Sequence, residues 1–266
     1  MNQQIRYQNI FQQQEPTHRL ELLISPKRVR VVFAGEVLAD SRAVRLLRES
    51  GRPPVYYFPR EDVRRDLLVS TGHVTRCPYK GKACYWTVKA GGRLCENAVW
   101  SFTEPGPEAP ELSGYMAFEW HRMDAWFEED EEVFVHPRDP YTRIDALHSS
   151  RHVRLVIDGE VVAESHRPVL LFETGLRTRY YLPKMDVDQG LLVPSERRTY
   201  CPYKGEARYY SLQIGEVVHA DIAWHYAYPT LEASSISGMI AFYDERVEAF
   251  YVDGELLPKS DGGADA

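Results

Sequence analysis

The five residues Cys-Pro-Tyr-Lys-Gly occur twice in the chain, at positions 77–81 and again at positions 201–205. Proline and glycine favour a bend, in which the cysteine, tyrosine and lysine are held in fixed positions relative to one another. A lysine in a partly buried pocket lined by tyrosines can transfer protons or anchor an anionic ligand. We therefore take Lys80 and Lys204 as candidates for acid–base chemistry or for anion binding.

The cysteine of this block, Cys77 in the first copy, has two interpretations. It acts as a nucleophile if a neighbouring cation stabilises its thiolate. A small cysteine at the end of a strand otherwise contributes to packing alone. The adjacent Tyr79 is a candidate ligand contact in the same bend.

Two adjacent tyrosines followed by an aspartate form the second candidate group. Its members are Tyr56, Tyr57 and Asp62 in the first copy and Tyr180, Tyr181 and Asp186 in the second. Neighbouring side chains of a strand point to opposite faces, so one tyrosine of each pair belongs to the core and the other faces a cavity. We assign the cavity to Tyr57 and Tyr181. Asp62 either caps a turn or orients Lys80 and accepts a substrate proton.

A tryptophan is followed by Ser101 in the first copy and by His225 in the second. In a strand this polar neighbour points away from Trp100 or Trp224. If it faces a pocket, the two copies bind different molecules or only one copy is active. The other candidate ligand contacts are Tyr85, Trp86 and Tyr209.

The motifs belong to a long internal repeat. Residues 29–130 recur as residues 153–254 without a gap, and more than a third of the aligned positions are identical. Solenoid modules have periods of roughly 20–50 residues, so a repeat of this length indicates a complete folding unit. The sequence therefore predicts one domain written twice.

Short apolar runs separated by glycine, proline and charged turns fill each copy. Asp158-Gly159 between two such runs is a strong hairpin signal. The pattern predicts a mainly β fold with two homologous, compact, antiparallel barrel- or sandwich-like domains, short helical turns and a pseudo-twofold relation. Residues 41–49 and 165–173 fit a short helix and a strand equally well.

We predict five segments along the chain. They are a flexible arm at 1–18, a first domain at 19–135, an ordered proline-containing linker at 136–151, a second domain at 152–258 and a disordered tail at 259–266. The linker either packs across a pseudo-twofold interface or acts as a rigid spacer. We expect a monomer with an internal pseudo-dimer, or a homodimer.

Composition narrows the class of protein. A net charge of −7 does not favour a nucleic-acid partner. No apolar run reaches the about 18 residues of a membrane span, and the polar N-terminus does not resemble a signal peptide. We expect a cytoplasmic protein that does not bind membranes. The spacing of cysteines and histidines does not predict a metal site, and no cofactor is predicted.

With these motifs, the chain resembles a tandem member of the "domain of unknown function 427" family, which is sometimes labelled nucleotidyltransferase-like. The resemblance extends over residues 18–258. It rests on residues 56–59, 62–63, 77–81, 100–101 and 114–118 of the first copy and 180–181, 186–187, 201–205 and 224 of the second. It implies small, mostly β domains without an established activity.

The nucleotidyltransferase label implies paired carboxylates that bind a divalent metal. The second copy has such a pair in Asp186 and Asp188, whereas the first copy has Asp62 and Arg64. The second copy also departs from the family pattern at His225, where serine is usual, and at Tyr210, where tryptophan is usual.

Three functions remain. The first is a small-molecule enzyme with an aromatic, lysine-containing pocket in one or both repeats. The second is a non-catalytic module that binds a small ligand in the same place, and the third is a structural or interaction protein. A buried and ordered Lys80 beside an open cavity favours the first two.

Overall fold

The computed structural model describes residues 18–107 and 109–259, so most of the predicted arm and tail lies outside the described residues. The chain divides between Asp139 and Pro140 into two compact units, which are described separately. We call them the first and the second repeat.

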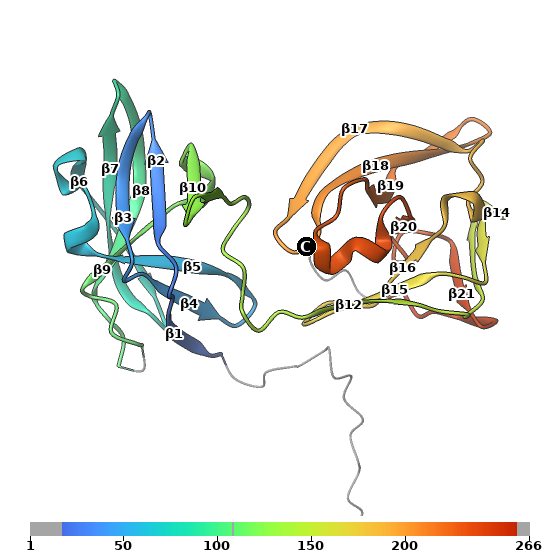
Figure 1. Ribbon diagram of the computed structural model, residues 1–266, viewed down its shortest axis with the longest axis horizontal. Helices are drawn as coiled ribbons and strands as arrows, with labels where there is room; N and C mark the ends of the chain where they lie inside the picture. Colours follow the sequence, from blue (N-terminus) through green and yellow to red (C-terminus); the bar gives the residue numbers. More distant parts are fainter. Residues whose placement is uncertain (1–17, 108, 260–266) are drawn as a thin grey trace, which may run out of the picture. The chain divides into compact units, whose positions relative to one another are not determined.

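The first repeat is built from a seven-stranded and a four-stranded antiparallel sheet (Figure 1). The larger sheet has the order β1-β4-β5-β9-β8-β7-β6, and the smaller has the order β11-β10-β2-β3. The strands are β1 (Leu20–Ile24), β2 (Val29–Phe33), β3 (Glu36–Ser41), β4 (Arg45–Glu49), β5 (Arg52–Pro59), β6 (Leu68–Cys77), β7 (Gly81–Ala90), β8 (Arg93–Glu104), β9 (Tyr115–Phe118), β10 (Ala125–Glu128) and β11 (Glu131–Glu132). Short 3-10 turns are η1 (Arg60–Asp62), η2 (Arg65–Leu67) and η3 (Trp120–Arg122).

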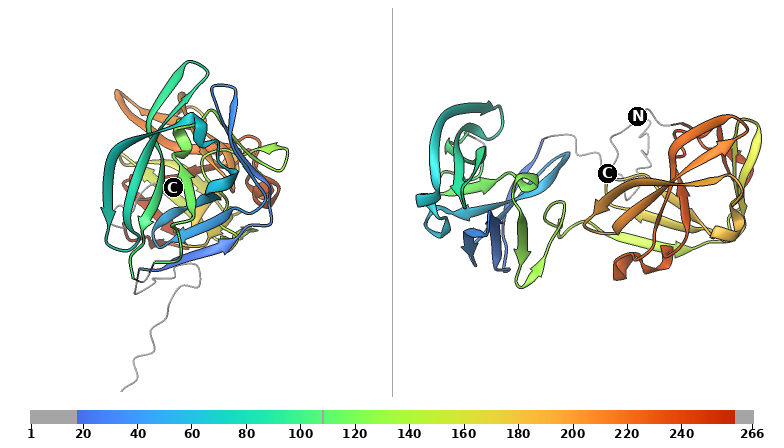
Figure 2. Two further views of the ribbon diagram at one scale, coloured as in Figure 1. Left: turned by 90° about the vertical axis from the view of Figure 1, so that its left-hand side faces the viewer. Right: turned by 90° about the horizontal axis from the view of Figure 1, so that it is seen from above.

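The second repeat has the same topology, with sheet orders β12-β15-β16-β20-β19-β18-β17 and β14-β13-β21-β22. Its strands are β12 (Ile144–His148), β13 (Val153–Ile157), β14 (Glu160–Ser165), β15 (Val169–Glu173), β16 (Arg179–Leu182), β17 (Leu192–Cys201), β18 (Gly205–Ile214), β19 (Val217–Tyr226), β20 (Ile240–Phe242), β21 (Ala249–Val252) and β22 (Glu255–Leu256). Its 3-10 turns are η4 (Lys184–Asp186) and η5 (Leu231–Ile236). In both repeats the three longest strands of the large sheet, β6–β8 and β17–β19, are curved (Figure 2).

Local sequence explains these elements. In β13 the alternate residues Val153, Leu155 and Ile157 are buried, as a half-buried strand requires. The predicted hairpin follows, with positive φ angles of 51° at Asp158 and 77° at Gly159. The ambiguous segment 41–49 is a turn and a strand rather than a helix: the Ser41 hydroxyl accepts the Ala43 N–H at 3.0 Å, and β4 begins at Arg45.

Each large sheet has apolar clusters on both faces. In the first repeat, one cluster fills the space between the two sheets and includes Val31 of β2, Tyr56 of β5 and Trp126 of β10. The other cluster lies on the opposite face and includes Tyr57 and Phe102. The predicted separation of the paired tyrosines is therefore confirmed. The fold prediction is also confirmed, in its sandwich-like form; neither large sheet closes into a barrel.

Strand β12 lies inside the segment 136–151 that we predicted as a linker. It pairs with β15 just as β1 pairs with β4 in the first repeat. Strands β1 and β12 share only one identical position, Leu23 and Leu147. For that reason they fall outside residues 29–130 and 153–254, the range of the repeat that was recognised from sequence identity. Farther upstream in the segment, Asp139 accepts a hydrogen bond from Arg48 of β4 at 2.7 Å.

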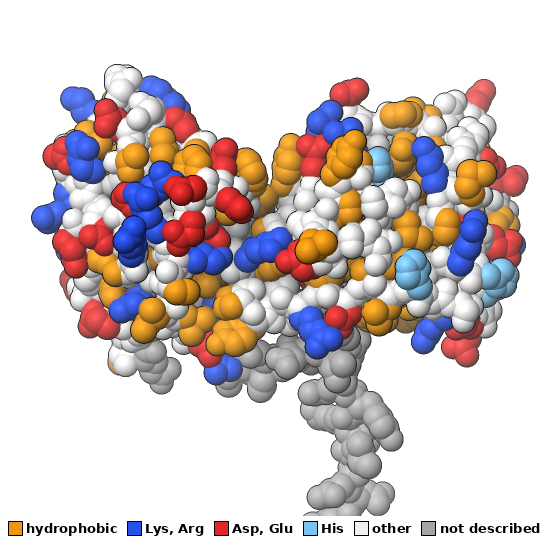
Figure 3. All heavy atoms as spheres, viewed as in Figure 1, with side chains coloured by type: hydrophobic (Ala, Val, Ile, Leu, Met, Phe, Trp, Pro, Cys, Tyr) orange, Lys and Arg blue, Asp and Glu red, His pale blue; other side chains and the backbone are white. Residues whose placement is uncertain are grey.

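The described residues include no helix that is long and apolar enough to span a membrane. Figure 3 shows acidic and basic side chains interleaved over the face in view. Ion pairs of the first repeat include Arg28–Asp40 and Arg64–Asp66. On that face, no large patch of one charge stands out.

Candidate functional site

The repeated Cys-Pro-Tyr-Lys-Gly block forms the turn between β6 and β7 in the first repeat. Cys77 is paired with Gly81 across this turn, and the Lys80 N–H donates to the Cys77 sulfur at 3.4 Å. Gly81 has a φ of 94°, and a Cβ there would lie 2.2 Å from the Glu104 carbonyl oxygen. Only glycine fits such a close approach, so the turn fixes where the lysine side chain starts.

Both lysines of the block are ion-paired with a glutamate in the interior. Lys80 binds Glu49, and the two side chains are 15% and 7% exposed. Lys204 binds Glu173 in the second repeat, where the exposed fractions are 10% and 5%. Burial, the largest single effect, lowers the pKa of Lys204, but Glu173 together with Cys201 and Tyr181 outweighs it, so the pKa is raised above its usual value. Lys204 is therefore a charged, paired ammonium at neutral pH.

Sequence reasoning missed the two glutamates. Each precedes its lysine by 31 residues and is identical in both copies, which was the available signal. Glu49 and Glu173 end the segments for which helix and strand were equally compatible with the sequence. Because the sequence did not decide between helix and strand, the direction in which each glutamate side chain points could not be assigned.

An aromatic pair lies near each lysine. Trp100 donates its indole N–H to the Tyr57 hydroxyl at 3.2 Å, and Trp224 donates to Tyr181 at 3.1 Å. The rings of each pair meet edge to face, at 88°. Burial raises the pKa of Tyr57, and it raises that of Tyr181 to about 12.

Several predicted site residues of the first repeat do share one face. Tyr57, Cys77, Tyr85 and Trp100 belong to the same apolar cluster. The Lys80 ammonium lies 5.9 Å from the centre of a phenylalanine ring of that cluster. The Tyr85 hydroxyl lies 3.0 Å from the hydroxyl of a threonine on β6, and Tyr209 makes the equivalent contact at 2.8 Å in the second repeat. The more peripheral Tyr79 stacks on His18 at 3.6 Å.

The sequence left open whether Asp62 caps a turn or orients Lys80, and in the structure the ion-pair partner of Lys80 is Glu49. Asp62 ends η1, and the following Val63 packs between the two sheets, in the cluster opposite that of Tyr57. Its counterpart Asp186 accepts hydrogen bonds from Ser165 at 2.7 Å and from Arg167. These bonds, with the Arg167 contact as the largest cause, lower the pKa of Asp186.

In the second repeat, additional side chains cover the lysine face. The Tyr243 ring lies 4.6 Å from Trp224, and the Arg179 guanidinium lies 5.4 Å from the same indole. Arg179 is held by Asp244 and Glu245. As a result Trp224 is buried, whereas Trp100 of the first repeat is only half-buried.

These cover residues have no equivalents of the same chemistry in the first repeat. The positions that correspond to Arg179, Tyr243, Asp244 and Glu245 hold Val55, Glu119, Trp120 and His121. The second copy therefore carries a charged and aromatic cover over a face that the first copy leaves less enclosed.

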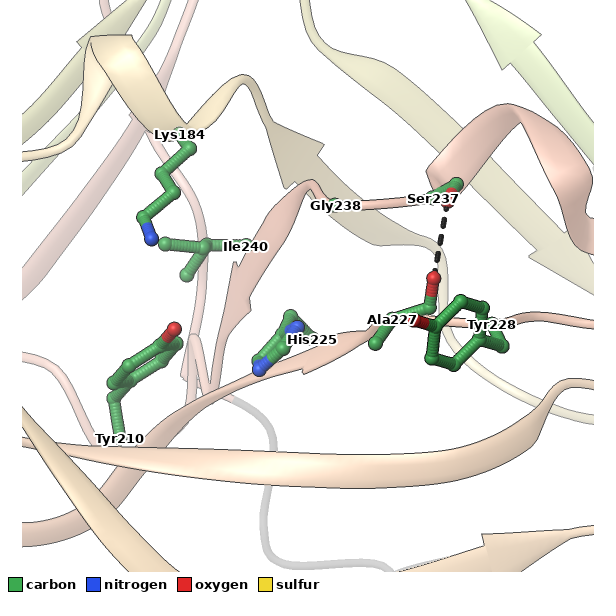
Figure 4. Close-up of a pocket in the computed structure, with 8 residues that line it drawn as sticks. All are labelled: Lys184, Tyr210, His225, Ala227, Tyr228, Ser237, Gly238 and Ile240. Carbon is green, nitrogen blue, oxygen red and sulfur yellow. Dashed lines mark hydrogen bonds between the residues drawn. The ribbon is translucent and has the colours of Figure 1, made fainter.

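A pocket of about 260 Å³ lies in the second repeat, on the other face of β19 from Trp224 (Figure 4). The residues that line it are Lys184, Tyr210, His225, Ala227, Tyr228, Ser237, Gly238 and Ile240. Of these, only His225 was predicted from sequence. The others come from η4, β18, β20 and the connection after β19, which only the fold brings together.

Three polar side chains in the pocket make no polar contact with any other described residue. Among the described residues, no hydrogen bond or ion pair involves the Lys184 ammonium, the Tyr210 hydroxyl or the His225 imidazole. Figure 4 shows them directed toward a common space. The His225 ring stacks on Tyr210, with 5.1 Å between the ring centres.

The histidine is poised in its neutral form. Burial lowers the pKa of His225, and the positive charges of Lys184 and Arg208 lower it further. A neutral imidazole presents one N–H donor and one nitrogen acceptor. The pocket therefore offers a cation, a hydroxyl and a proton acceptor within one small space.

The equivalent positions of the first repeat are arranged differently. Ser101, which replaces His225, is fully buried and donates to the Tyr115 carbonyl oxygen at 2.6 Å. Arg60, which replaces Lys184, lies 6.0 Å from the centre of the Trp86 ring. The predicted alternation around Trp100 and Trp224 is confirmed, and the polar neighbour lies in a pocket in the second repeat.

No group of three or more His, Cys, Asp or Glu side chains is placed to hold a metal ion in the described part of the chain. All four cysteines are free thiols. A search of curated proteins finds no relative of this chain. Residues 21–129 and 145–253 each match the model of the family described as "Domain of unknown function (DUF427)", so the chain belongs to that family and carries its domain twice.

Proposed function

We propose that this protein binds a small molecule in the pocket of the second repeat. The observation that carries the proposal is the convergence of Lys184, Tyr210 and His225, whose polar atoms have no hydrogen-bond or ion-pair partner in the described part of the chain. Ligand sites commonly combine an apolar lining with a few polar groups that fix orientation, and this pocket has Ile240 and Ala227 beside its polar side chains. Unpaired polar groups of this kind gain hydrogen bonds when a ligand enters.

The repeated lysines serve a different purpose in this proposal. Lys80 and Lys204 are already neutralised by Glu49 and Glu173, so neither offers a free charge to a ligand. Removal of one partner from a buried ion pair leaves an uncompensated charge, which explains why both members are kept in both copies. We assign these pairs to the stability of each repeat.

An acid–base enzyme that uses the same pocket is the second candidate. The specific observation in its favour is the neutral His225 imidazole, which can accept a proton from a bound substrate. Tyr210, stacked on that ring, would then contact the substrate through its hydroxyl. Binding is the step that both candidates share, and product formation is the step that separates them.

A thermal-shift screen of metabolites tests the proposal. A ligand at about a hundred times its Kd stabilises the folded state by about 2.7 kcal/mol, which gives a measurable rise in Tm. We expect the rise to be lost in Lys184→Ala and in His225→Ala. Lys259→Ala is the matched control, because it removes an exposed lysine that does not line the pocket.

Hits are then incubated with the wild-type protein and followed by mass spectrometry. A new product that requires His225 identifies the enzyme, and binding without a product identifies the non-catalytic module. Hits that survive Lys184→Ala and His225→Ala but are lost in Lys80→Ala would contradict the proposal and place the site on the lysine face of the first repeat.

A further inference from the structure

The pocket of the second repeat has two chemically different ends. Figure 4 shows Lys184 and Tyr210 with Ile240 at one end and Tyr228 with Ala227 and Ser237 at the other, with His225 between them. We call the end with the Lys184 ammonium the polar end. A ligand that fills the pocket must therefore match a cation at that end and a tyrosine ring at the other.

The polar end favours an anion. None of the eight residues that line the pocket is acidic, and Lys184 contributes a full positive charge. Arg208, which is paired with His225 across β18 and β19, adds a weaker positive charge, because its guanidinium also donates a hydrogen bond to Glu206 at 2.8 Å. Hydrogen bonds to charged groups are stronger than those between neutral groups, so a carboxylate gains more here than an amide or an alcohol.

The end at Tyr228 favours a flat ring. Tyr228 is 87% exposed although it lines the pocket, so the tyrosine ring is free to cover a bound group. Gly238 lines the same region, and a Cβ at that position would meet nothing within 4 Å. An aromatic ring placed in this open space would pack against the tyrosine in an offset or edge-to-face manner.

The size of the pocket limits the ligand. Its volume of about 260 Å³ lies below the about 300–1,000 Å³ of pockets that hold drug-sized molecules. A single ring with one short substituent fits within that limit, whereas a dinucleotide or a long acyl chain does not.

From this complementarity we infer that the ligand of the pocket is a single-ring aromatic carboxylate. Its carboxylate binds the Lys184 ammonium and accepts the Tyr210 hydroxyl proton in a hydrogen bond, and its ring lies against Tyr228. This inference rests on the proposed function and specifies the chemical class that the pocket selects.

The test is a set of NMR titrations of the full chain with three probes: benzoate, benzamide and acetate. Benzoate carries both the ring and the charge, benzamide keeps the ring, and acetate keeps the charge. Binding is read from the backbone and His225 ring signals. We expect benzoate to bind at least about tenfold more tightly than either of the other probes, a difference of about 1.4 kcal/mol or more.

Two substitutions separate the contributions of charge and ring. Lys184→Gln should weaken benzoate about tenfold, which corresponds to about 1.4 kcal/mol, and leave benzamide unchanged. Tyr228→Ala should weaken benzoate and benzamide alike. Lys259→Gln, the charge-matched control, should change neither. Lys184 and Tyr228 are exposed, so both variants keep the core intact.

Two outcomes overturn the inference and are distinguishable from each other. Equal affinity for benzoate and benzamide, or benzoate binding that ignores Lys184→Gln, would reject the aromatic carboxylate while the pocket remains a ligand site. If none of the three probes shifts signals of the pocket, and no metabolite of the thermal-shift screen binds there, the proposed function fails with it.

Discussion

The two repeats share one frame but differ on both faces of the large sheet. The first repeat leaves Trp100 half-buried on its lysine face and buries Ser101 completely on the other. The second repeat covers Trp224 with Arg179 and Tyr243, and it places His225 in a pocket. On the lysine face, the second repeat is therefore more enclosed than the first. On the opposite face of the sheet, the first repeat is the more enclosed of the two.

This difference separates the residues that are identical in the two copies from those that differ, and the two sets have different roles. The ion pairs of Lys80 and Lys204 and the bonded pair of tyrosine and tryptophan occur in both copies; they are buried in the second repeat and partly buried in the first. The pocket instead depends on positions where the copies diverge, such as His225 and Lys184. Shared residues of the interior maintain the frame, and most residues that line the proposed site are divergent, apart from Ser237 and Gly238, which match Ser113 and Gly114.

The largest expected effect concerns the buried ion pairs. Glu173→Ala leaves the Lys204 ammonium buried without a partner, and we expect the second repeat to lose about 3–5 kcal/mol of stability. Glu49→Ala should cost less, because Lys80 is more exposed and reaches water more easily. Urea unfolding followed through NMR signals of each repeat measures both. An equal and small loss in the two repeats would show that the pairs are not structural.

The next effect comes from exchanging Ser101 and His225, the residues at which the two repeats differ next to the conserved tryptophan. Ser101→His forces a larger side chain into a fully buried site, and overpacking should cost the first repeat about 1–3 kcal/mol. His225→Ser removes a partly exposed ring, so the second repeat should change by less than about 0.5 kcal/mol while ligand binding is lost. A stable Ser101→His variant that binds the ligand would remove the contrast between the repeats.

The smallest effect is a pH dependence confined to the cover of the second repeat. Burial opposes ionisation of Glu245, but the Arg179 guanidinium is the main cause that lowers its pKa from the ordinary 4.5 to about 2. The pKa is depressed, so the stabilisation is complete above pH 4.5 and is lost as the pH falls toward about 2. The neighbouring Asp244 opposes this effect, because burial raises its pKa.

We therefore expect Glu245→Gln to flatten the acid unfolding profile of the second repeat by about 1 kcal/mol over this range, after discounting for solvent screening. The first repeat, which has His121 at the corresponding position, is the internal control. The profiles are measured by urea titration at a series of pH values. An unchanged slope in the second repeat would show that the cover does not contribute through charge.

Much of the frame could be predicted from local patterns. The Asp158-Gly159 turn, the opposite faces of Tyr56 and Tyr57, and the alternation at Trp224 and His225 all follow from the two-residue period of a strand. These features depend only on neighbours in the chain. The structure confirms each of them.

The site could not be assembled in this way because its residues are distant in the chain. Lys184, Tyr210 and Tyr228 meet through the pairing of β16, β18, β19 and β20, and no local pattern marks them. Glu49 was missed because its segment fitted two conformations. Tyr210 and His225 were visible as departures from the family pattern, but only the fold shows that the two departures stack on each other.

A crystallographic fragment screen of the full chain tests the central claim most directly. We predict that bound aromatic fragments cluster beside Lys184 and His225 in the second repeat, and that His225→Ser crystals lose them. Fragments that gather instead at Lys80 and Trp100 of the first repeat, or that ignore the His225→Ser substitution, would contradict the account.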